Sequence, residues 1–189
     1  GSEMCIRDSN NNTAGMTGAG VHNEGTSLTI DRSTLSNNQT LGGQGGAIYN
    51  VATDESTFTN VTLSGNVAAQ GAAIFTESHV NITNATIVNN TGSSTLHAQP
   101  GSGSVDIKNS ILVNNSGNNT NQSLNSLGFN IEDGASAFGP NTGDQQNAND
   151  FQTTMADLSD NGGPTLTHAL LSGNAAIDAG SSIDAPNVD

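Results

Sequence analysis

The sequence predicts an all-β fold, a parallel β-solenoid of about four to five coils with roughly 25 residues in each coil. Three observations support this prediction. Two short motifs recur at a nearly fixed spacing, alternating apolar residues accompany them, and the apolar content is too small for an ordinary globular core. Leu, Ile, Val and Phe provide 37 of the 189 residues, whereas Gly, Asn, Ser and Thr provide 92. A thin, repetitive core fits these proportions.

The two motifs set the length of the repeat. The first places small residues before an apolar one and begins at Gly18, Gly45 and Gly71, so that its copies are 27 and 26 residues apart. The second, apolar-x-x-Asn, ends at Asn38, Asn66, Asn90 and Asn115, at intervals of 28, 24 and 25 residues. One such unit cannot bury its apolar side chains alone, but coils stacked about 4.8 Å apart bury them together.

An alternating pair of residues precedes each copy of the second motif and predicts a short strand with one buried face. The pairs are Leu28/Ile30, Ser56/Phe58, Val80/Ile82 and Val105/Ile107. In a stacked solenoid the corresponding residues of successive coils lie on one another. The asparagines at the end of the second motif then form a structural ladder, because each amide both donates and accepts, whereas a column of carboxylates would repel itself. This predicted ladder consists of Asn38, Asn66, Asn90 and Asn115.

The composition divides the chain into four parts. Residues 1–9 include Met4-Cys5-Ile6-Arg7-Asp8-Ser9, which looks like the translation of a transposon-type sequencing adapter. Residues 10–115 carry the predicted coils. Residues 116–155 lose the period and predict an irregular coil with polar loops. Residues 156–189 predict a terminal solenoid or cap segment, and we expect the natural chain to extend beyond both ends.

Two stretches resemble known families. Gly45-Gly46-Ala47-Ile48, followed by apolar-x-x-Asn, resembles the repeats of chlamydial-type polymorphic outer-membrane proteins, which are right-handed parallel β-helices. The carboxy-terminal segments 126–131, 158–171 and 176–180 resemble the ending of bacterial right-handed β-helix proteins of the choice-of-anchor Q type. The resemblance therefore implies a right-handed parallel β-helix and a protein that is secreted or held at the cell surface.

The charge of the chain excludes several partners. Three Lys and Arg residues stand against 17 Asp and Glu residues, for a formal net charge of −14. Nucleic acid and anionic membrane surfaces would be repelled, so we expect no nucleic-acid partner. No run approaches 18 apolar residues, so we expect no direct insertion into a membrane.

The residue types that bind metals are present but scattered. Asp144 with Asp150, and Asp157 with Asp160, have the oxygen chemistry for calcium but lack the spacing of a calcium loop. The four histidines, His22, His79, His97 and His168, form no i, i+4 pair. We therefore expect no metal site and no cofactor, and we expect His168 to be packed or hydrogen-bonded in a terminal strand.

Parallel β-helices include pectate lyases and polygalacturonases, which raises an enzymatic alternative. A lyase needs a cationic base, for which Arg32 and Lys108 are the candidates outside the leader. A glycoside hydrolase needs paired carboxylates, and Asp31 and Asp106 occupy comparable places in their coils. No Gly-x-Ser-x-Gly elbow indicates a serine hydrolase.

The sequence thus leads to two functional expectations. The first is a non-catalytic, surface-exposed or secreted module, adhesin-like or in contact with glycans or other cell-surface components, with no catalytic residues. The alternative is a polysaccharide lyase or glycoside hydrolase of the pectate-lyase-like type. An ice-binding surface is disfavoured because Thr57-Phe58-Thr59 and Thr165-Leu166-Thr167 do not recur in register.

Overall fold

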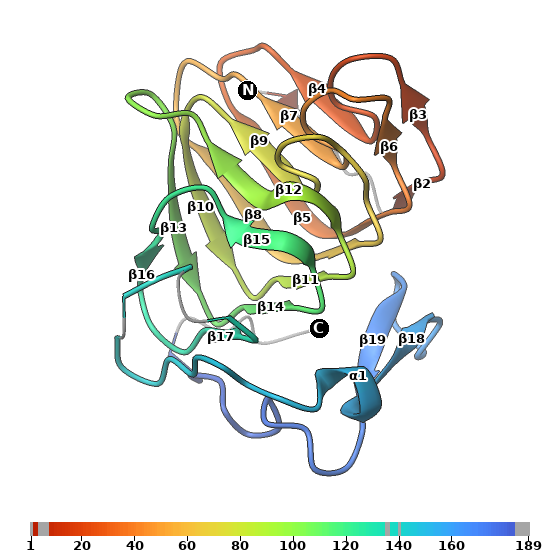
Figure 1. Ribbon diagram of the computed structural model, residues 1–189, viewed down its shortest axis with the longest axis vertical. Helices are drawn as coiled ribbons and strands as arrows, with labels where there is room; N and C mark the ends of the chain where they lie inside the picture. Colours follow the sequence, from red (N-terminus) through yellow and green to blue (C-terminus); the bar gives the residue numbers. More distant parts are fainter. Residues whose placement is uncertain (1, 4–7, 135–136, 140, 184–189) are drawn as a thin grey trace.

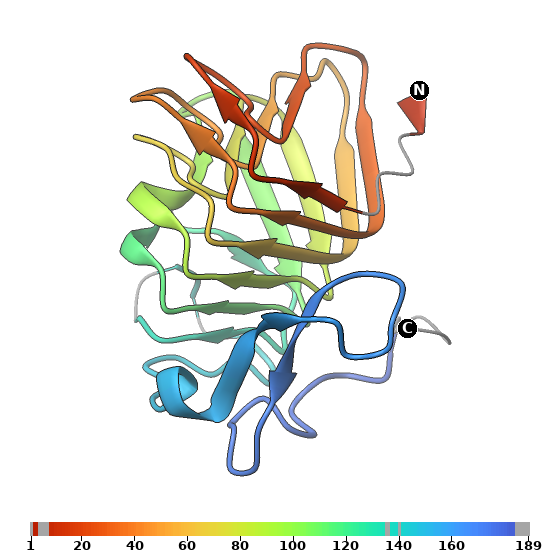
Figure 2. The same ribbon diagram turned by 90° about the vertical axis from the view of Figure 1, so that its right-hand side faces the viewer.

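The protein, described as a computed structural model over residues 2–3, 8–134, 137–139 and 141–183, is a parallel β-solenoid. About five turns, roughly 25 residues apart, stack along one axis, so the predicted fold class is confirmed. Figure 2 shows the coils stacked from the red amino-terminal coil to the cyan coil near residue 130. The one described helix, α1 (Phe151–Thr154), has four residues and is too short to cross a membrane.

Each coil contributes strands to three faces, because the chain turns at corners rich in Asn and Gly. The first face comprises β1 (Ser2–Glu3), the first halves of β5 (Leu28–Ser36) and β8 (Ser56–Ser64), β10 (His79–Thr83), β13 (Ser104–Lys108) and β16 (Asn125–Ser126). The second face comprises β2 (Asp8–Asn10), the second halves of β5 and β8, β11 (Thr86–Val88), β14 (Ile111–Val113) and β17 (Ile131–Glu132). The third face comprises β4 (Val21–Asn23), β7 (Ile48–Asn50), β9 (Ile74–Thr76), β12 (Thr91–Ala98) and β15 (Ser116–Thr120). The short strands β3 (Thr13–Ala14) and β6 (Gln39–Thr40) pair with each other, and each comes just before the chain enters this face (Figure 1).

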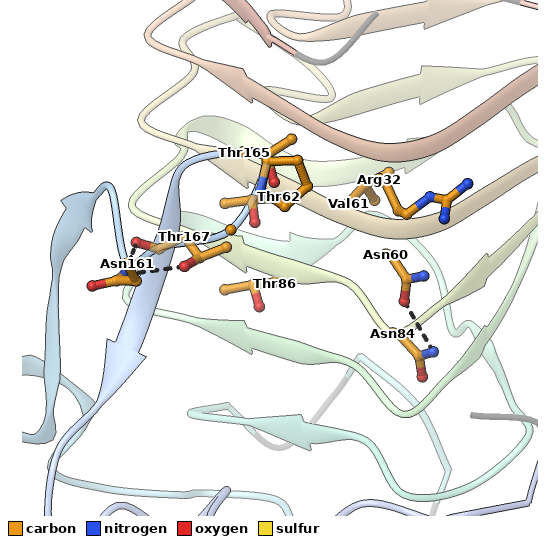
Figure 3. Close-up of a pocket in the computed structure, with 11 residues that line it drawn as sticks. Arg32, Asn60, Val61, Thr62, Asn84, Thr86, Asn161, Thr165 and Thr167 are labelled. Atoms are coloured by element: carbon orange, nitrogen blue, oxygen red, sulfur yellow. Dashed lines mark hydrogen bonds between the residues drawn. The ribbon is translucent and has the colours of Figure 1, made fainter. Parts of the chain in front are cut away.

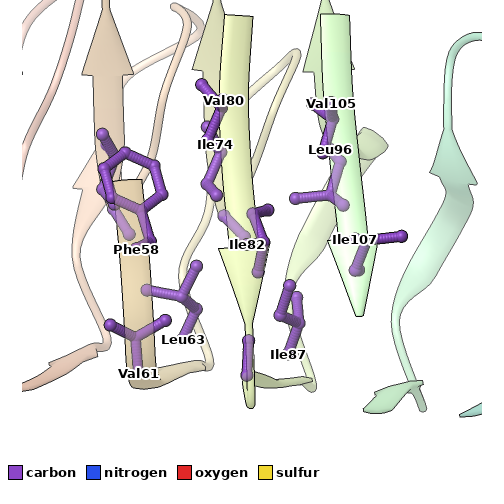
Figure 4. Packing of buried hydrophobic residues seen from close by; sticks show 14 of the residues in the cluster. Phe58, Val61, Leu63, Ile74, Val80, Ile82, Ile87, Leu96, Val105 and Ile107 are labelled. Atoms are coloured by element: carbon purple, nitrogen blue, oxygen red, sulfur yellow. The ribbon is translucent and has the colours of Figure 1, made fainter. Parts of the chain in front are cut away.

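The core consists of inward columns in which like residues stack on like. Ile82 pairs in register with Phe58 on one side and Ile107 on the other, and all three are at most 1% exposed. Figure 4 shows these side chains packed between neighbouring coils. The predicted alternation therefore places the correct residues inside. Each added coil extends the same apolar column, which is how a chain with few large apolar residues still buries a continuous core.

The corner between the first and second faces has the same backbone conformation in four successive coils. Arg32, Asn60, Asn84 and Asn109 all have φ between 46° and 56°. This left-handed region is uncommon for residues other than glycine, and asparagine is enriched in it. We call this column the first corner. It turns each side chain outward at the edge of the second face.

The asparagines singled out by the second motif form a hydrogen-bonded ladder at the next corner. The amide Nδ2 of Asn38 donates to Asn66 Oδ1 at 3.1 Å, Asn66 donates to Asn90 at 3.0 Å, and Asn90 donates to Asn115 at 3.1 Å. Two residues outside the motif extend it: Asn12 donates to Asn38 at 2.9 Å, and Asn115 donates to Asn119 at 3.2 Å. The ladder satisfies buried polar groups along most of the stack.

The described structure differs in detail from the four parts drawn from the sequence. Strand β1 pairs with Leu28–Thr29 and strand β2, which begins at Asp8, pairs with Thr34–Ser36, so the segment 1–9 contributes paired structure. Met4-Cys5-Ile6-Arg7 lies outside the described residues. Residues 116–134 are more regular than predicted, since β15, β16 and β17 complete another coil. The polar loops begin only after that coil.

The carboxy-terminal segment leaves the stack and packs beside it, as Figures 1 and 2 show. Strands β18 (Met155–Ser159) and β19 (Thr167–Leu170) form an antiparallel pair instead of a further coil. Thr34 Oγ1 donates to the Leu166 carbonyl at 2.7 Å, and the segment buries a second apolar cluster of Val88, Val113, Ile131 and Phe151. The segment thereby covers outward-facing residues of the second face.

His168 is one of the residues that fix this segment. Its Nδ1 donates to the Ala156 carbonyl at 2.7 Å, and its Nε2 lies 2.9 Å from Ser64 Oγ. This agrees with the expectation of a hydrogen-bonded histidine in a terminal strand. The contact joins the β18–β19 pair to β8 of the solenoid.

Glu132 ends an inward column that is apolar from Leu35 onward. The column runs through Leu35, Leu63, Ile87 and Leu112 before it reaches Glu132, which is fully buried. Its carboxylate accepts hydrogen bonds from the Ala137 backbone N–H at 3.1 Å and from Gln146 Nε2 at 3.1 Å. Burial is the largest influence and raises the pKa of Glu132, against the opposing effect of these hydrogen bonds.

We therefore expect Glu132→Gln to increase the free energy of unfolding at neutral pH, and to increase it less in acid. A raised folded-state pKa means that the folded protein holds its proton more tightly than the unfolded chain. The contribution of Glu132 to stability is thus full below the unfolded pKa of about 4.3 and falls as pH rises through the folded pKa. Urea unfolding of parent and variant between acidic and neutral pH measures this difference. A variant that is less stable than the parent at neutral pH would contradict the conclusion that the buried carboxylate of Glu132 destabilises the fold.

Candidate functional site

The first face presents a polar surface to solvent. Two outward columns alternate with the buried ones. One column contains Thr29, Thr57, Asn81 and Asp106, and the other contains Asp31, Thr59, Thr83 and Lys108. These side chains are half-buried or exposed, and we call the two columns the polar face. Because successive coils are in register, the polar groups repeat about every 4.8 Å along the axis.

Charges of both signs are mixed on and around the polar face. Arg32 Nε lies 2.9 Å from Asp31 Oδ2, and both side chains are about half exposed. His79 Nε2 lies 3.8 Å from a carboxylate oxygen of Glu55 and 3.8 Å from one of Asp106. Its Nδ1 lies 2.7 Å from Ser104 Oγ. An exposed ion pair such as that of Arg32 and Asp31 contributes little stability.

The structure separates the residues of the enzymatic alternative. Asp31 lies in register with Thr59, Thr59 with Thr83, and Thr83 with Lys108, so three coil spacings separate Asp31 from Lys108. Asp106 belongs to the same coil as Lys108, so about 14 Å of axial distance lies between the two aspartates. Paired carboxylates of glycoside hydrolases lie about 5 to 9.5 Å apart. The same axial distance separates Arg32 from Lys108, so the structure does not gather these candidates into one site.

A groove lies between the solenoid and the carboxy-terminal segment, beside the first corner. It has a volume of about 430 Å³ and is lined by Arg32, Asn60, Val61, Thr62, Asn84, Thr86, Asn161, Gly163, Pro164, Thr165 and Thr167. Figure 3 shows the solenoid residues Thr62 and Thr86 between the asparagines of the first corner and Asn161, Thr165 and Thr167 of the terminal segment. The polar part of the lining consists of hydroxyl and amide groups together with the Arg32 guanidinium, and Val61 and Pro164 contribute apolar surface. No carboxylate belongs to it, so the groove suits a ligand with neutral hydrogen-bonding groups.

A column of aromatic rings on the third face was not predicted from the sequence. His22, Tyr49, Phe75 and His97 stack with ring centroids 4.9, 5.3 and 5.0 Å apart. Burial lowers the pKa of His97, and burial together with Glu77 and Glu24 raises the pKa of Tyr49. Three of the four rings share a sequence pattern, since His22, Tyr49 and Phe75 each come directly after the apolar residue of the first motif. Because the ring faces pack on one another, the column stabilises the stacking of successive coils and does not present its ring faces as a flat surface for a ligand.

The aspartates that were considered for calcium are not gathered into a metal site among the described residues. Asp144 is engaged in structural hydrogen bonds instead, since it accepts from Ser126 Oγ at 2.6 Å and from the backbone N–H groups of Asn130 and Asn141 at 2.8 Å each. Across residues 8–134, 137–139 and 141–183, no group of three or more His, Cys, Asp or Glu side chains is arranged to hold a metal ion.

Comparisons of the chain with known protein families, with curated proteins and with solved structures find no match.

Proposed function

We propose that the protein is a non-catalytic module that contacts glycans or other cell-surface components through its polar face. The observation that carries this proposal is the repetition of neutral hydroxyl and amide groups, such as those of the half-buried Thr57, Thr59 and Asn81, along the outward side of the first face with matched spacing. Each group makes only a weak contact with a sugar hydroxyl. A repeated ligand meets several of them at once, and such contacts add through multivalency.

The separation of the two carboxylate candidates from each other, and of the two cationic candidates from each other, supports a binding role over catalysis. A hydrolase or lyase needs its acid, base and electrostatic groups gathered around one bond. Asp31 and Asp106 lie too far apart along the axis for that purpose. The proposal includes an extracellular or cell-surface location and kinship with bacterial β-helix proteins of the choice-of-anchor Q type, which rest on the sequence resemblance.

We expect saturable binding to a neutral polysaccharide and no turnover. The assay incubates the protein with immobilised neutral plant and algal glycans, pectin, alginate and chondroitin, with and without calcium. Binding is expected to fall several-fold in the double variant Thr57→Ala/Asn81→Ala, because both side chains belong to one column of the polar face. The matched control is Ser102→Ala, an exposed residue in the turn between β12 and β13.

Robust turnover would contradict this proposal. Loss of that turnover in Arg32→Ala, Lys108→Ala or Asp106→Ala would establish the polysaccharide lyase or hydrolase alternative. Binding that is equal in the double variant and in Ser102→Ala would place the contact elsewhere on the molecule.

A further inference from the structure

One asparagine of the first corner holds a peptide backbone. Asn109 Nδ2 donates to the Ser181 carbonyl at 3.1 Å, and the Ser181 backbone N–H donates to Asn109 Oδ1 at 2.9 Å. A single side-chain amide thus satisfies both backbone groups of one residue, as an adjacent β-strand does. The two residues are 72 positions apart in the chain, so the contact is a docking interaction between segments.

The same corner position is occupied by asparagine in the two preceding coils. Asn60, Asn84 and Asn109 have φ values of 54°, 56° and 50°, so their side chains leave the backbone in the same way. Asn84 Nδ2 donates to Asn60 Oδ1 at 3.2 Å. Asn60 Nδ2 and Asn84 Oδ1 take no part in that bond, and within the described part of the chain they make no hydrogen bond. One donor and one acceptor therefore remain, which are the two functions that Asn109 uses to hold Ser181.

Asn60 and Asn84 are both lining residues of the groove, on the side away from Asn161 in Figure 3. Its volume of about 430 Å³ lies within the usual range of ligand sites, about 300 to 1,000 Å³. Thr62 and Thr86 add hydroxyl groups on the solenoid side, and Val61 and Pro164 add apolar surface. The absence of carboxylates from the lining means that backbone carbonyl groups of a ligand are not repelled.

We propose that this groove binds an extended polypeptide segment of a partner protein. Asn60 and Asn84 hold its backbone carbonyl and N–H groups, as Asn109 holds those of Ser181. The side chains next to the held residue are small, as Gly180 and Ser182 are beside Ser181. A glycan also carries hydroxyl groups, but the chemistry already seen at this corner is recognition of a peptide backbone, and this inference does not depend on the polar face.

The test uses the full chain and a capped synthetic peptide with the sequence of residues 179–183. Nuclear magnetic resonance follows the side-chain amide signals of ¹⁵N-labelled protein during titration. We expect saturable shifts of the Asn60 and Asn84 amide signals at millimolar peptide. The double variant Asn60→Gly/Asn84→Gly is expected to weaken binding at least tenfold, because glycine keeps the left-handed backbone conformation and removes the amide.

Two controls separate recognition of the backbone from other effects. A peptide methylated on the nitrogen of its first serine lacks the N–H that Asn84 accepts, and we expect it to bind at least tenfold more weakly. The variant Thr57→Ala on the polar face should bind the unmodified peptide as the parent does. Thermal unfolding of the double variant confirms that it remains folded, and the methylated peptide tests the proposal on the unchanged protein.

The proposal is overturned if the Asn60 and Asn84 signals do not respond to millimolar peptide, or if the methylated peptide binds as well as the unmodified one. It is equally overturned if these signals respond to a soluble neutral oligosaccharide and not to the peptide, since the groove would then be a glycan site.

Discussion

Ile82→Asp is expected to destabilise the protein by more than about 4 kcal/mol, which is a large share of the stability of a typical domain. Ile82 is 1% exposed and stacks between Phe58 and Ile107 in the first-face column of the core. The substitution removes apolar contacts from both neighbouring coils. It also places an unpaired carboxylate where no described cation can reach it, and the cost of burying that charge adds to the loss of packing.

Thr83→Asp is the matched control for this prediction. It introduces the same carboxylate one residue later, on the outward side of the same strand, in register with Lys108. We expect a change within about 1 kcal/mol, as for most surface substitutions. Circular dichroism during urea unfolding compares the two variants. Equal stability of Ile82→Asp and the parent would contradict the solenoid core described above.

Asn66→Asp is expected to cost about 3 to 5 kcal/mol at neutral pH, in the range found when one partner of a buried polar network is lost. The Asn66 side chain is fully buried. Its Nδ2 donates to the Leu35 carbonyl at 2.9 Å and to Asn90 Oδ1 at 3.0 Å. A carboxylate would accept where Asn66 now donates, so two buried acceptors would face a negative charge without a proton between them.

The loss should become smaller in acid. Burial among acceptors raises the pKa of the new carboxyl group above its unfolded value of about 3.9, so the variant is favoured at low pH and weakened as pH rises through the folded pKa. Asn60→Asp provides the control, because Asn60 is only half-buried and its Oδ1 accepts from Asn84. Equal effects of the two substitutions at neutral pH would show that the ladder does not stabilise the coils.

Much of the fold could be predicted because its determinants repeat. Leu63 and Ile87, or Asn66 and Asn90, are 24 residues apart in sequence and adjacent in space. The period therefore identifies both the inward columns and the ladder. The aromatic column was missed because its members differ in residue type and burial: Phe75 is buried and His22 is exposed. His97 follows Phe75 by 22 residues, which departs from the spacing of the first motif.

The candidate site could be predicted less well. Residue types alone suggested that Asp31 and Asp106 share a site, whereas strand register places two coils between them. The groove was not predicted, because five of its eleven lining residues come from residues 161–167, which carry no repeat. Its asparagines follow the alternating pairs of each coil, but nothing in their spacing distinguishes an outward corner from an ordinary turn.

The sequence by itself determined the β-solenoid, the length of its coils and the residues that face inward, because each coil repeats the contacts of the one before and the period carries that information. Only the tertiary structure decided what covers the second face and where the groove lies. Thr34 meets Leu166 across 132 residues, and Asn109 meets Ser181 across 72. These contacts join a periodic segment to a non-periodic one. Their geometry depends on the path of the whole chain, so no spacing in the sequence encodes them.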